Sequence, residues 1–223
     1  MEYRQLGASG LRVPALSFGA GTFGGSGPLF GAWGNSDADE ARKLVDICLE
    51  AGVNLFDTAD VYHRGESETL FGRALGKRRG EAVIATKVGM RMDQGLQNAG
   101  LSARHIHGSI DASLSRIGTD WIDVFICHRP DPLTPLHETL TALDAVVRAG
   151  KARYIGFSNW PAWLAAKAIA MQQANGLARF VTGQMYYSLV ARDIEQEYVP
   201  LALDAGIGTM VWSPLSSGFL SGK

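Results

Sequence analysis

The chain has 223 residues, of which 46% are hydrophobic, so it can bury one sizeable core and its length favours a single domain. Its 21 Lys and Arg residues nearly balance 22 Asp and Glu residues, which excludes a strong overall field for nucleic acid or anionic lipid. The N-terminus lacks an apolar signal core and no apolar run approaches the ~20 residues of a membrane helix, so we expect a cytoplasmic protein without membrane insertion.

Short β-like runs alternate with helix-like segments along the chain. The stretch from Tyr3 to Val13 first predicts a small hairpin that turns at residues 8–10. Seven β-like runs follow it: Ala15–Ala20, Asn54–Asp57, Ala82–Val88, Trp121–His128, Ala152–Ser158, Phe180–Tyr186 and Thr209–Ser213. From the second run onward, the runs begin 28 to 39 residues apart, which is the length of a strand–helix–strand unit.

Two of the segments between these runs have clear helix signals. The first has an apolar face with the spacing i, i+3, i+4, i+7, i+8, made by Ala41, Leu44, Val45, Cys48 and Leu49. Ser36 and Asp39 have the spacing of a capping box at its start, and Gly52 suits its end. In the second, Thr134 and Pro135 predict the N-cap and the first helical residue. Cys48 and Cys127 lie in apolar runs, which favours buried thiols over a disulfide.

The unbroken alternation favours one domain over residues 1–223, a parallel (β/α)8 barrel of the TIM type in which this sequence accounts for seven strands. An open doubly wound sheet is the alternative, because Gly19–Gly24 matches the dinucleotide fingerprint G-x-G-x-x-G and Asp39 lies about 20 residues on. The fingerprint needs a helix at its third glycine, whereas further glycines and Pro28 exclude a helix before about Asp37. We therefore expect a long mobile loop over an active site.

Polar residues are found where the strands of this barrel are expected to end. Asp57 and His128 end the second and fourth strands, Lys87 lies near the end of the third, and Tyr62 lies just beyond the second. Each has a structural explanation by itself: Asp57 as a cap, Lys87 as a surface lysine, His128 as a core histidine. Lys87 follows four buried-type residues, however, and an unpaired ammonium there would be costly, so we expect Asp57 to be its partner.

Five segments together resemble the aldo-keto reductases, within the branch that includes bacterial reductases and the β-subunits of voltage-gated potassium channels. They are Leu55–Tyr62, Gly65–Glu68, Ala85–Lys87, Gly156–Asn159 and Trp212–Leu215, and the resemblance covers essentially the whole chain. It implies that Tyr62 is the general acid, that Lys87 and Asp57 tune it, and that His128 orients a carbonyl substrate. An ammonium beside a phenol favours the phenolate and lowers its pKa, which agrees with this division.

The resemblance also implies NADPH as the hydride donor and no metal. Its cofactor-binding positions correspond here to Gly21, Thr22, Asp57, Ser158, Asn159, Gln184, Trp212, Ser213, Leu215, Ser217 and Lys223. Trp212 is expected to stack on the nicotinamide, and Ser158, Asn159 and Gln184 to bind its carboxamide. The substrate pocket is expected to include Phe30, Trp33, Arg91, Trp160 and the loop Arg129–Pro135.

Two functions follow as hypotheses. The first is an enzyme that reversibly reduces an aldehyde or ketone with NAD(P)H; the second is a cofactor-sensing regulatory subunit of a membrane protein. The four intact catalytic positions favour the enzyme. The family's barrel has eight strands, so we also expect the native product to continue beyond Lys223 with the last strand and a clamp on the adenosine phosphate. The oligomeric state has no signal in the sequence.

Overall fold

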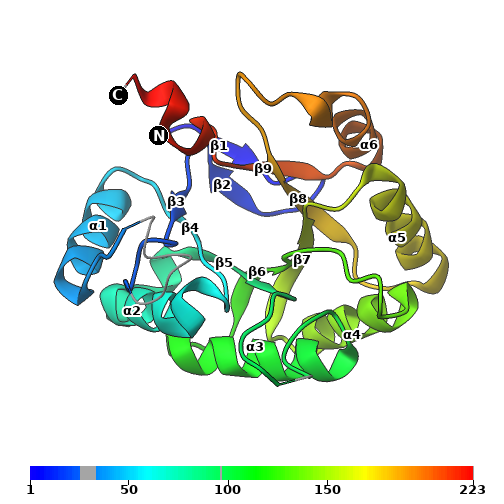
Figure 1. Ribbon diagram of the computed structural model, residues 1–223, viewed down its shortest axis with the longest axis horizontal. Helices are drawn as coiled ribbons and strands as arrows, with labels where there is room; N and C mark the ends of the chain where they lie inside the picture. Colours follow the sequence, from blue (N-terminus) through cyan, green and yellow to red (C-terminus); the bar gives the residue numbers. More distant parts are fainter. Residues whose placement is uncertain (26–33, 96, 223) are drawn as a thin grey trace.

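Seven parallel strands form one curved sheet whose spatial order follows the chain, as the computed structural model shows for residues 1–25, 34–95 and 97–222 (Figure 1). The strands are β3 (Phe18–Gly19), β4 (Leu55–Asp57), β5 (Val83–Val88), β6 (Ile122–Cys127), β7 (Ala152–Ser158), β8 (Phe180–Tyr186) and β9 (Gly208–Trp212). The sheet curls into a partial (β/α)8 barrel, which confirms the predicted fold class.

In the described residues, six α-helices lie along the outer side of the curved sheet (Figure 1). They are α1 (Ala38–Glu50), α2 (Glu66–Leu75), α3 (Ala103–Ile117), α4 (Leu136–Arg148), α5 (Ala162–Asn175) and α6 (Tyr198–Ala205), and four short 3-10 segments accompany them: η1 (Tyr62–Gly65), η2 (Gly76–Glu81), η3 (Asp193–Glu195) and η4 (Ser216–Ser221). In the part of the chain that the structure describes, no helix combines the length and apolarity needed to cross a membrane.

The predicted N-terminal hairpin is present and closes one end of the barrel interior. It consists of β1 (Tyr3–Gln5) and β2 (Arg12–Pro14), which pair antiparallel. The amide of Ala8 donates to the carbonyl oxygen of Gly206 at 2.7 Å. A Cβ atom on Gly7 would lie 2.5 Å from the amide nitrogen of Gly208, so only glycine allows the hairpin turn to come this close to the start of β9.

Side chains of each strand alternate between two apolar layers. On β6, Val124 and Ile126 belong to a small inner cluster, whereas Phe125 and Cys127 belong to the large cluster between sheet and helices. On β5, Ala85 likewise packs in the inner cluster. This alternation places Lys87, two residues after Ala85, on the inner side at the carboxyl end of β5.

The strand predictions agree closely with the structure except for Ala15–Ala20, of which only Phe18–Gly19 forms a strand, β3. Strands β7 and β8 have the expected bounds. The two helix caps were predicted incorrectly. The N-cap of α1 is Asp37, whose side chain accepts from the amides of Asp39 and Glu40, and not Ser36. The N-cap of α4 is Pro135, because its ψ of 129° is not helical, while the hydroxyl of Thr134 donates to Asp131.

The rejection of the dinucleotide fingerprint is confirmed. Phe23 forms a parallel bridge with Ser36, and α1 begins only at Ala38, so no helix opens among the described fingerprint residues 19–24. Asp39 lies in the first turn of α1, where it cannot act as the ribose-binding acid of that motif. Phe30, Trp33 and most of the glycine-rich loop lie outside the described residues.

Candidate active site

Three consecutive strand ends bring the four predicted catalytic residues together. Asp57 ends β4, Lys87 is the fifth residue of β5, and His128 directly follows β6. Nζ of Lys87 donates to Oδ2 of Asp57 at 2.6 Å and to the hydroxyl oxygen of Tyr62 at 3.3 Å. The lysine therefore joins the carboxylate and the phenol in one cluster.

Lys87 is a fully buried cation whose ammonium group donates hydrogen bonds to oxygen atoms of neighbouring residues. Its side chain is 0% exposed, and besides Asp57 and Tyr62 it donates to the carbonyl oxygen of Thr58 at 2.7 Å. Burial favours the neutral amine, but the charge of Asp57 and the hydroxyl of Tyr62 outweigh burial and raise the pKa of Lys87. The ammonium is thus permanently charged at neutral pH, which is what a group that stabilises a phenolate must be.

Tyr62 is a protonated phenol with two opposing influences on its acidity. Burial raises the pKa of Tyr62 above its usual value, and the ammonium of Lys87 acts in the opposite direction. Lys87 thus acts to lower the pKa of Tyr62, as predicted. The larger effect of burial nevertheless leaves this pKa above the usual value of a tyrosine. Nζ of Lys87 also lies 4.9 Å from the centre of the Tyr62 ring, a cation–π distance.

The backbone after Tyr62 makes an unusual left-handed turn. His63 and Arg64 have φ values of 48° and 56°, and Gly65 follows at 89°. Such non-glycine conformations each cost about 1–3 kcal/mol and persist only where the surroundings determine them. One contact with the surroundings of this turn is between the ring Nε2 of His63 and the carbonyl oxygen of Gly21, which lie 3.1 Å apart. This contact ties the segment carrying Tyr62 to the loop after β3.

His128 faces the edge of the phenol ring and is neutral. The two ring centroids are 5.9 Å apart with an interplanar angle of 80°. Burial, with the charges of Lys87 and Arg129, lowers the pKa of His128 to about 2. Among the described residues, its buried Nδ1 has no hydrogen-bond partner. A neutral imidazole beside the phenol can donate a hydrogen bond to a substrate oxygen.

The next strand ends present the polar groups predicted to bind a carboxamide. Gln184 on β8 donates from Nε2 to Oδ1 of Asp57 at 2.8 Å. Asn159, at a φ of 58°, donates to Oγ of Ser158 at 2.9 Å and accepts from Nε1 of Trp212 at 3.0 Å. Trp212 is 41% exposed and stacks on Tyr186, with their ring centroids 4.8 Å apart. Amide, hydroxyl and aromatic groups converge here, which fits a flat, amide-bearing ring such as nicotinamide.

The segment after β9 is a tight turn of polar residues. Ser213, Ser216 and Ser217 all have positive φ, and the amide of Ser217 donates to Oγ of Ser213 at 3.0 Å. Leu215 is 55% exposed, and its carbonyl oxygen accepts from the amide of Gly218. Lys223 lies outside the described residues.

The first two strands bring Gly21 and Thr22 beside Asp57. The amide of Ala20 donates to the carbonyl oxygen of Asp57 at 2.8 Å, and the carbonyl oxygen of Thr22 accepts from the amide of Ser36 at 2.9 Å. Gly21 and Thr22 therefore lie at the same end of the sheet as the candidate catalytic residues. A ribose contact from them stays a prediction.

One predicted pocket residue lies elsewhere. Trp160 is 1% exposed and packs on Phe157 and Phe180 in the outer core, so its assignment to the substrate pocket was wrong. The sequence pattern could not show this, because an aromatic residue after a strand suits a core and a pocket equally. Arg91 donates to carbonyl oxygens of its own loop, those of Asp93 and Gly95.

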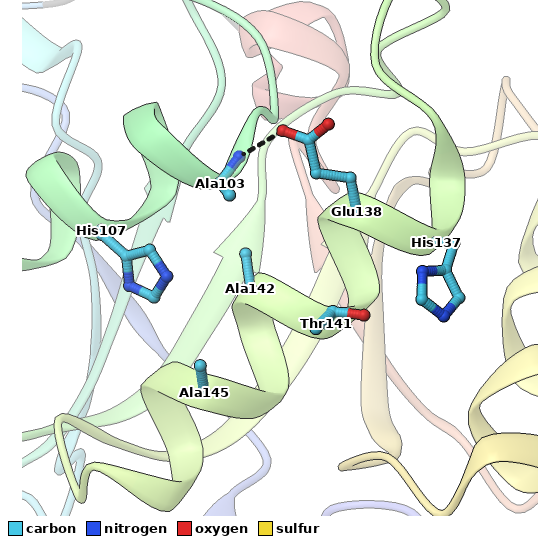
Figure 2. Close-up of a pocket in the computed structure, with 7 residues that line it drawn as sticks. All are labelled: Ala103, His107, His137, Glu138, Thr141, Ala142 and Ala145. Carbon is cyan, nitrogen blue, oxygen red and sulfur yellow. Dashed lines mark hydrogen bonds between the residues drawn. The ribbon is translucent and has the colours of Figure 1, made fainter.

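A separate hollow of about 370 Å³ lies between α3 and α4 on the outside of the barrel (Figure 2). Its lining includes His107 from α3 and His137 and Glu138 from α4, and Glu138 accepts from the amide of Ala103 at 2.9 Å. None of the predicted catalytic residues lines it. Within the described ranges, no group of three or more His, Cys, Asp or Glu residues could hold a metal ion.

Sequence reasoning missed a buried polar cluster on the other side of the β5 wall. Asp60 and Glu68 are almost completely buried, and Glu68 forms an ion pair with the partly exposed guanidinium of Arg116. Asp60 and Glu68 belong to segments that carry the family resemblance, but their spacing indicated no role. The signal that could have found them is a pair of acidic residues in stretches that must be buried.

Comparison with known proteins supports the motif assignment. Residues 15–223 match the model of the aldo/keto reductase family. The chain is 41% identical over its whole length to a rice protein named "Probable voltage-gated potassium channel subunit beta", and spans 66% of that protein. It is 38% identical to versiconal hemiacetal acetate reductase of Aspergillus parasiticus, over 99% of this chain and 69% of that one. It is 37% identical to an oxidoreductase of Bacillus subtilis, YrpG, over its whole length and 69% of that protein. The chain thus covers just under two thirds of the rice relative.

Proposed function

Because the chain belongs to the aldo/keto reductase family, we propose that it reduces an aldehyde or ketone to the alcohol, with Tyr62 as proton donor and NADPH as hydride source. The observation that carries the proposal is the contact of the buried Lys87 ammonium with both Asp57 and the Tyr62 hydroxyl. A charged lysine at a buried phenol has one evident chemical use, which is to stabilise the phenolate left after proton transfer.

The proposed reaction divides the work between the cofactor and this chain. A nicotinamide bound at this site would supply the hydride for the carbonyl carbon. Tyr62 gives its phenolic proton to the carbonyl oxygen, which becomes the hydroxyl of the alcohol. His128 is neutral and donates a hydrogen bond that orients the carbonyl oxygen. Asp57 accepts from Lys87 and so holds the ammonium against the phenol.

The polar groups of β7–β9 are the proposed nicotinamide site. Ser158, Asn159 and Gln184 would bind the carboxamide, and the exposed ring of Trp212 would cover the nicotinamide. Gly21 and Thr22 would border the ribose, while Ser213, Leu215, Ser217 and Lys223 would follow the pyrophosphate. The preference for NADPH over NADH rests on the family resemblance.

The test is Tyr62→Phe, which keeps the ring and removes the proton. We expect turnover to fall about 10²–10⁴-fold, the range for loss of a general acid, with nearly unchanged cofactor affinity. The measurements are NADPH absorbance against a panel of aldehydes, ketones and sugars, and NADPH fluorescence for binding. Tyr3→Phe is the control, because Tyr3 lies in the N-terminal hairpin and donates to Gly52. Equal activity of wild type and Tyr62→Phe would contradict the proposal.

A second candidate function follows from the names of relatives. Two plant proteins, each 41% identical, are both named "Probable voltage-gated potassium channel subunit beta". The alternative is therefore a regulatory subunit that binds cofactor and a membrane protein, with slow or absent turnover. Stoichiometric recovery of one membrane protein in a pull-down, with no turnover on the substrate panel, would favour it over the enzyme.

A further inference from the structure

A buried acidic cluster lies on the far side of β5 from the catalytic lysine. It consists of Asp60, Thr86 of β5, Glu68 of α2, and Ser109 and Arg116 of α3. Asp60 is 1% exposed and Glu68 is 0% exposed. The two acids are thus shielded from water, whereas the side chain of Arg116 is 23% exposed. If both acids are ionised, this one cation leaves the charges of the cluster unbalanced.

The donors in the cluster are distributed unequally between the two acids. Glu68 accepts from Nε of Arg116 at 2.7 Å and from Oγ1 of Thr86 at 2.5 Å, so both of its oxygens have a donor. Asp60 accepts from Oγ of Ser109 at 2.9 Å, and its other oxygen, Oδ1, is buried with no partner in the described chain. The ionised form is therefore well supported for Glu68 and poorly supported for Asp60.

Electrostatics agrees with this distribution. Burial, followed by the charge of Glu68, raises the pKa of Asp60 to about 7, against the opposing effects of Ser109, Arg116 and the backbone amide of Val61. An unpartnered oxygen also costs less in a neutral carboxyl than in a carboxylate. The geometry and the field both favour a protonated Asp60.

Tyr62 lies in the segment of residues 60–65, and members of the cluster are involved in contacts at both ends of this segment. At one end, the amide of Asp60 donates to the carbonyl oxygen of Lys87 at 3.2 Å. At the other, Cδ of Arg116 lies only 2.6 Å from where a Cβ atom on Gly65 would be, so the arginine packs directly on the end of the left-handed turn. A negative charge on Asp60 also raises the pKa of Tyr62.

We propose that Asp60 is a positioning residue for the proton-donating site: in the folded protein it keeps its proton to a higher pH than an exposed aspartate does, and losing that proton makes Tyr62 a weaker acid. The proposal rests on the proposed role of Tyr62 in reduction, but both halves of it can be measured without turnover. The titratable groups that act on the Asp60 carboxyl are Glu68 from α2 and Arg116 from α3. Asp60 in turn acts on Tyr62 of η1, and its amide contacts the backbone of Lys87 on β5.

Two nuclear magnetic resonance titrations test the proposal on the whole chain. The first follows the carboxyl carbons of ¹³C-labelled aspartate, with Asp60→Asn to assign the Asp60 signal. The second follows ¹⁹F in a fluorotyrosine placed at position 62, whose lower intrinsic pKa brings the titration into the range where the protein is folded. We expect the Asp60 signal to titrate well above the exposed aspartates, and the position-62 signal to titrate at lower pH in Asp60→Asn than in wild type.

Matched variants separate this effect from general loss of charge or structure. Asp111→Asn removes an exposed carboxylate from the same helix α3, one that pairs with Lys151, and should leave the position-62 titration unchanged. Ser109→Ala keeps the carboxyl but removes its donor, and should move the Asp60 titration to higher pH. The proposal is overturned if Asp60 ionises together with the exposed aspartates, or if Asp60→Asn leaves the position-62 midpoint where it was. Failure of Tyr62→Phe to lose turnover, by contrast, would overturn the reductase function alone.

Discussion

Gln184 donates to Oδ1 of Asp57 at 2.8 Å, although the two residues lie 127 positions apart on β8 and β4. Three strands separate β8 from β4 in the sheet, so the bond crosses the barrel interior. Lys87 holds the other carboxylate oxygen at 2.6 Å. Asp57 is thereby fixed from two sides by residues that are distant in sequence, and its position depends on the curvature of the sheet.

Gln184→Leu tests this bond as a structural tie. We expect the free energy of unfolding to fall by about 2 kcal/mol, since hydrogen bonds to charged groups contribute about 1.5–3 kcal/mol. Denaturation in urea measures the change. The control is Gln173→Leu, on the exposed side of α5, which should change stability by less than about 0.5 kcal/mol. Equal effects of the two substitutions would show that the bond across the barrel contributes nothing to the fold.

Lys87→Met tests the buried ion pair. Removing one partner leaves the carboxylate of Asp57 without its compensating charge, so we expect a loss of about 3–5 kcal/mol in unfolding free energy. The double variant Lys87→Met/Asp57→Asn should be more stable than Lys87→Met, because no uncompensated charge is left. A double-mutant cycle in urea gives the coupling. Additive effects of the two substitutions would contradict a coupled pair.

The pH dependence of stability should carry two contributions of opposite sign. Because the pKa of Asp60 is higher in the folded chain than in the unfolded chain, Asp60 stabilises the fold fully below about pH 4, the pKa of an aspartate in the unfolded chain. This contribution is lost as pH rises to about 7. The lowered pKa of His128 gives a contribution that is present above about pH 6.5 and is lost as pH falls towards 2. Each has a slope of up to about 1.4 kcal/mol per pH unit.

Urea titrations of Asp60→Asn and His128→Asn between pH 4 and pH 8 measure these contributions. Relative to wild type, Asp60→Asn should gain stability as pH rises through this range. His128→Asn should gain stability as pH falls below about 6.5, because the unfolded wild-type chain takes up a proton that the folded chain excludes. Parallel curves for wild type and either variant would contradict the corresponding pKa shift.

Two helical glycines should respond oppositely to alanine. A Cβ atom on Gly72 in α2 would lie 2.2 Å from the carbonyl oxygen of Ile117, whereas one on Gly108 in α3 would meet nothing within 4 Å. Gly108→Ala should therefore stabilise the protein by about 0.5–1 kcal/mol through helix propensity. Gly72→Ala should destabilise it by about 1–3 kcal/mol, because α2 and α3 must separate. Thermal denaturation compares the two, and a gain in both would contradict the close approach.

Much of the fold could be predicted because it depends on local patterns. The runs Ala152–Ser158 and Phe180–Tyr186 are rich in aromatic and β-branched residues, and the structure places β7 and β8 at those bounds. The helix caps were harder, because Ser36 and Asp37 are both good N-cap residues and the choice depends on the bridge between Ser36 and Phe23, a tertiary contact.

Some residues of the candidate site could likewise be predicted from the sequence, and others could not. Asp57, Lys87 and His128 could be found because parallel strands place their carboxyl ends at one edge, whatever the details of packing. The Gln184 bond to Asp57 could not, since it depends on how far the sheet curls. The roles of Asp60 and Trp160 depend on which side of the sheet each faces after the strand has ended, where the alternation of a strand no longer applies.

Strand β5 separates two groups of polar residues with a single layer of backbone. Thr86 faces Glu68 in the helix layer and Lys87 faces Asp57 in the barrel, although they are adjacent in the chain. A slip of one residue along β6, from the observed pairing of Lys87 with Ile126, would exchange the two sides and send the ammonium to Glu68 and Arg116. The backbone ladder between β5 and β6 thus determines which groups surround Tyr62 as much as any side chain does. We expect a single-residue insertion or deletion there to abolish the proposed reaction while leaving every candidate catalytic residue in the chain.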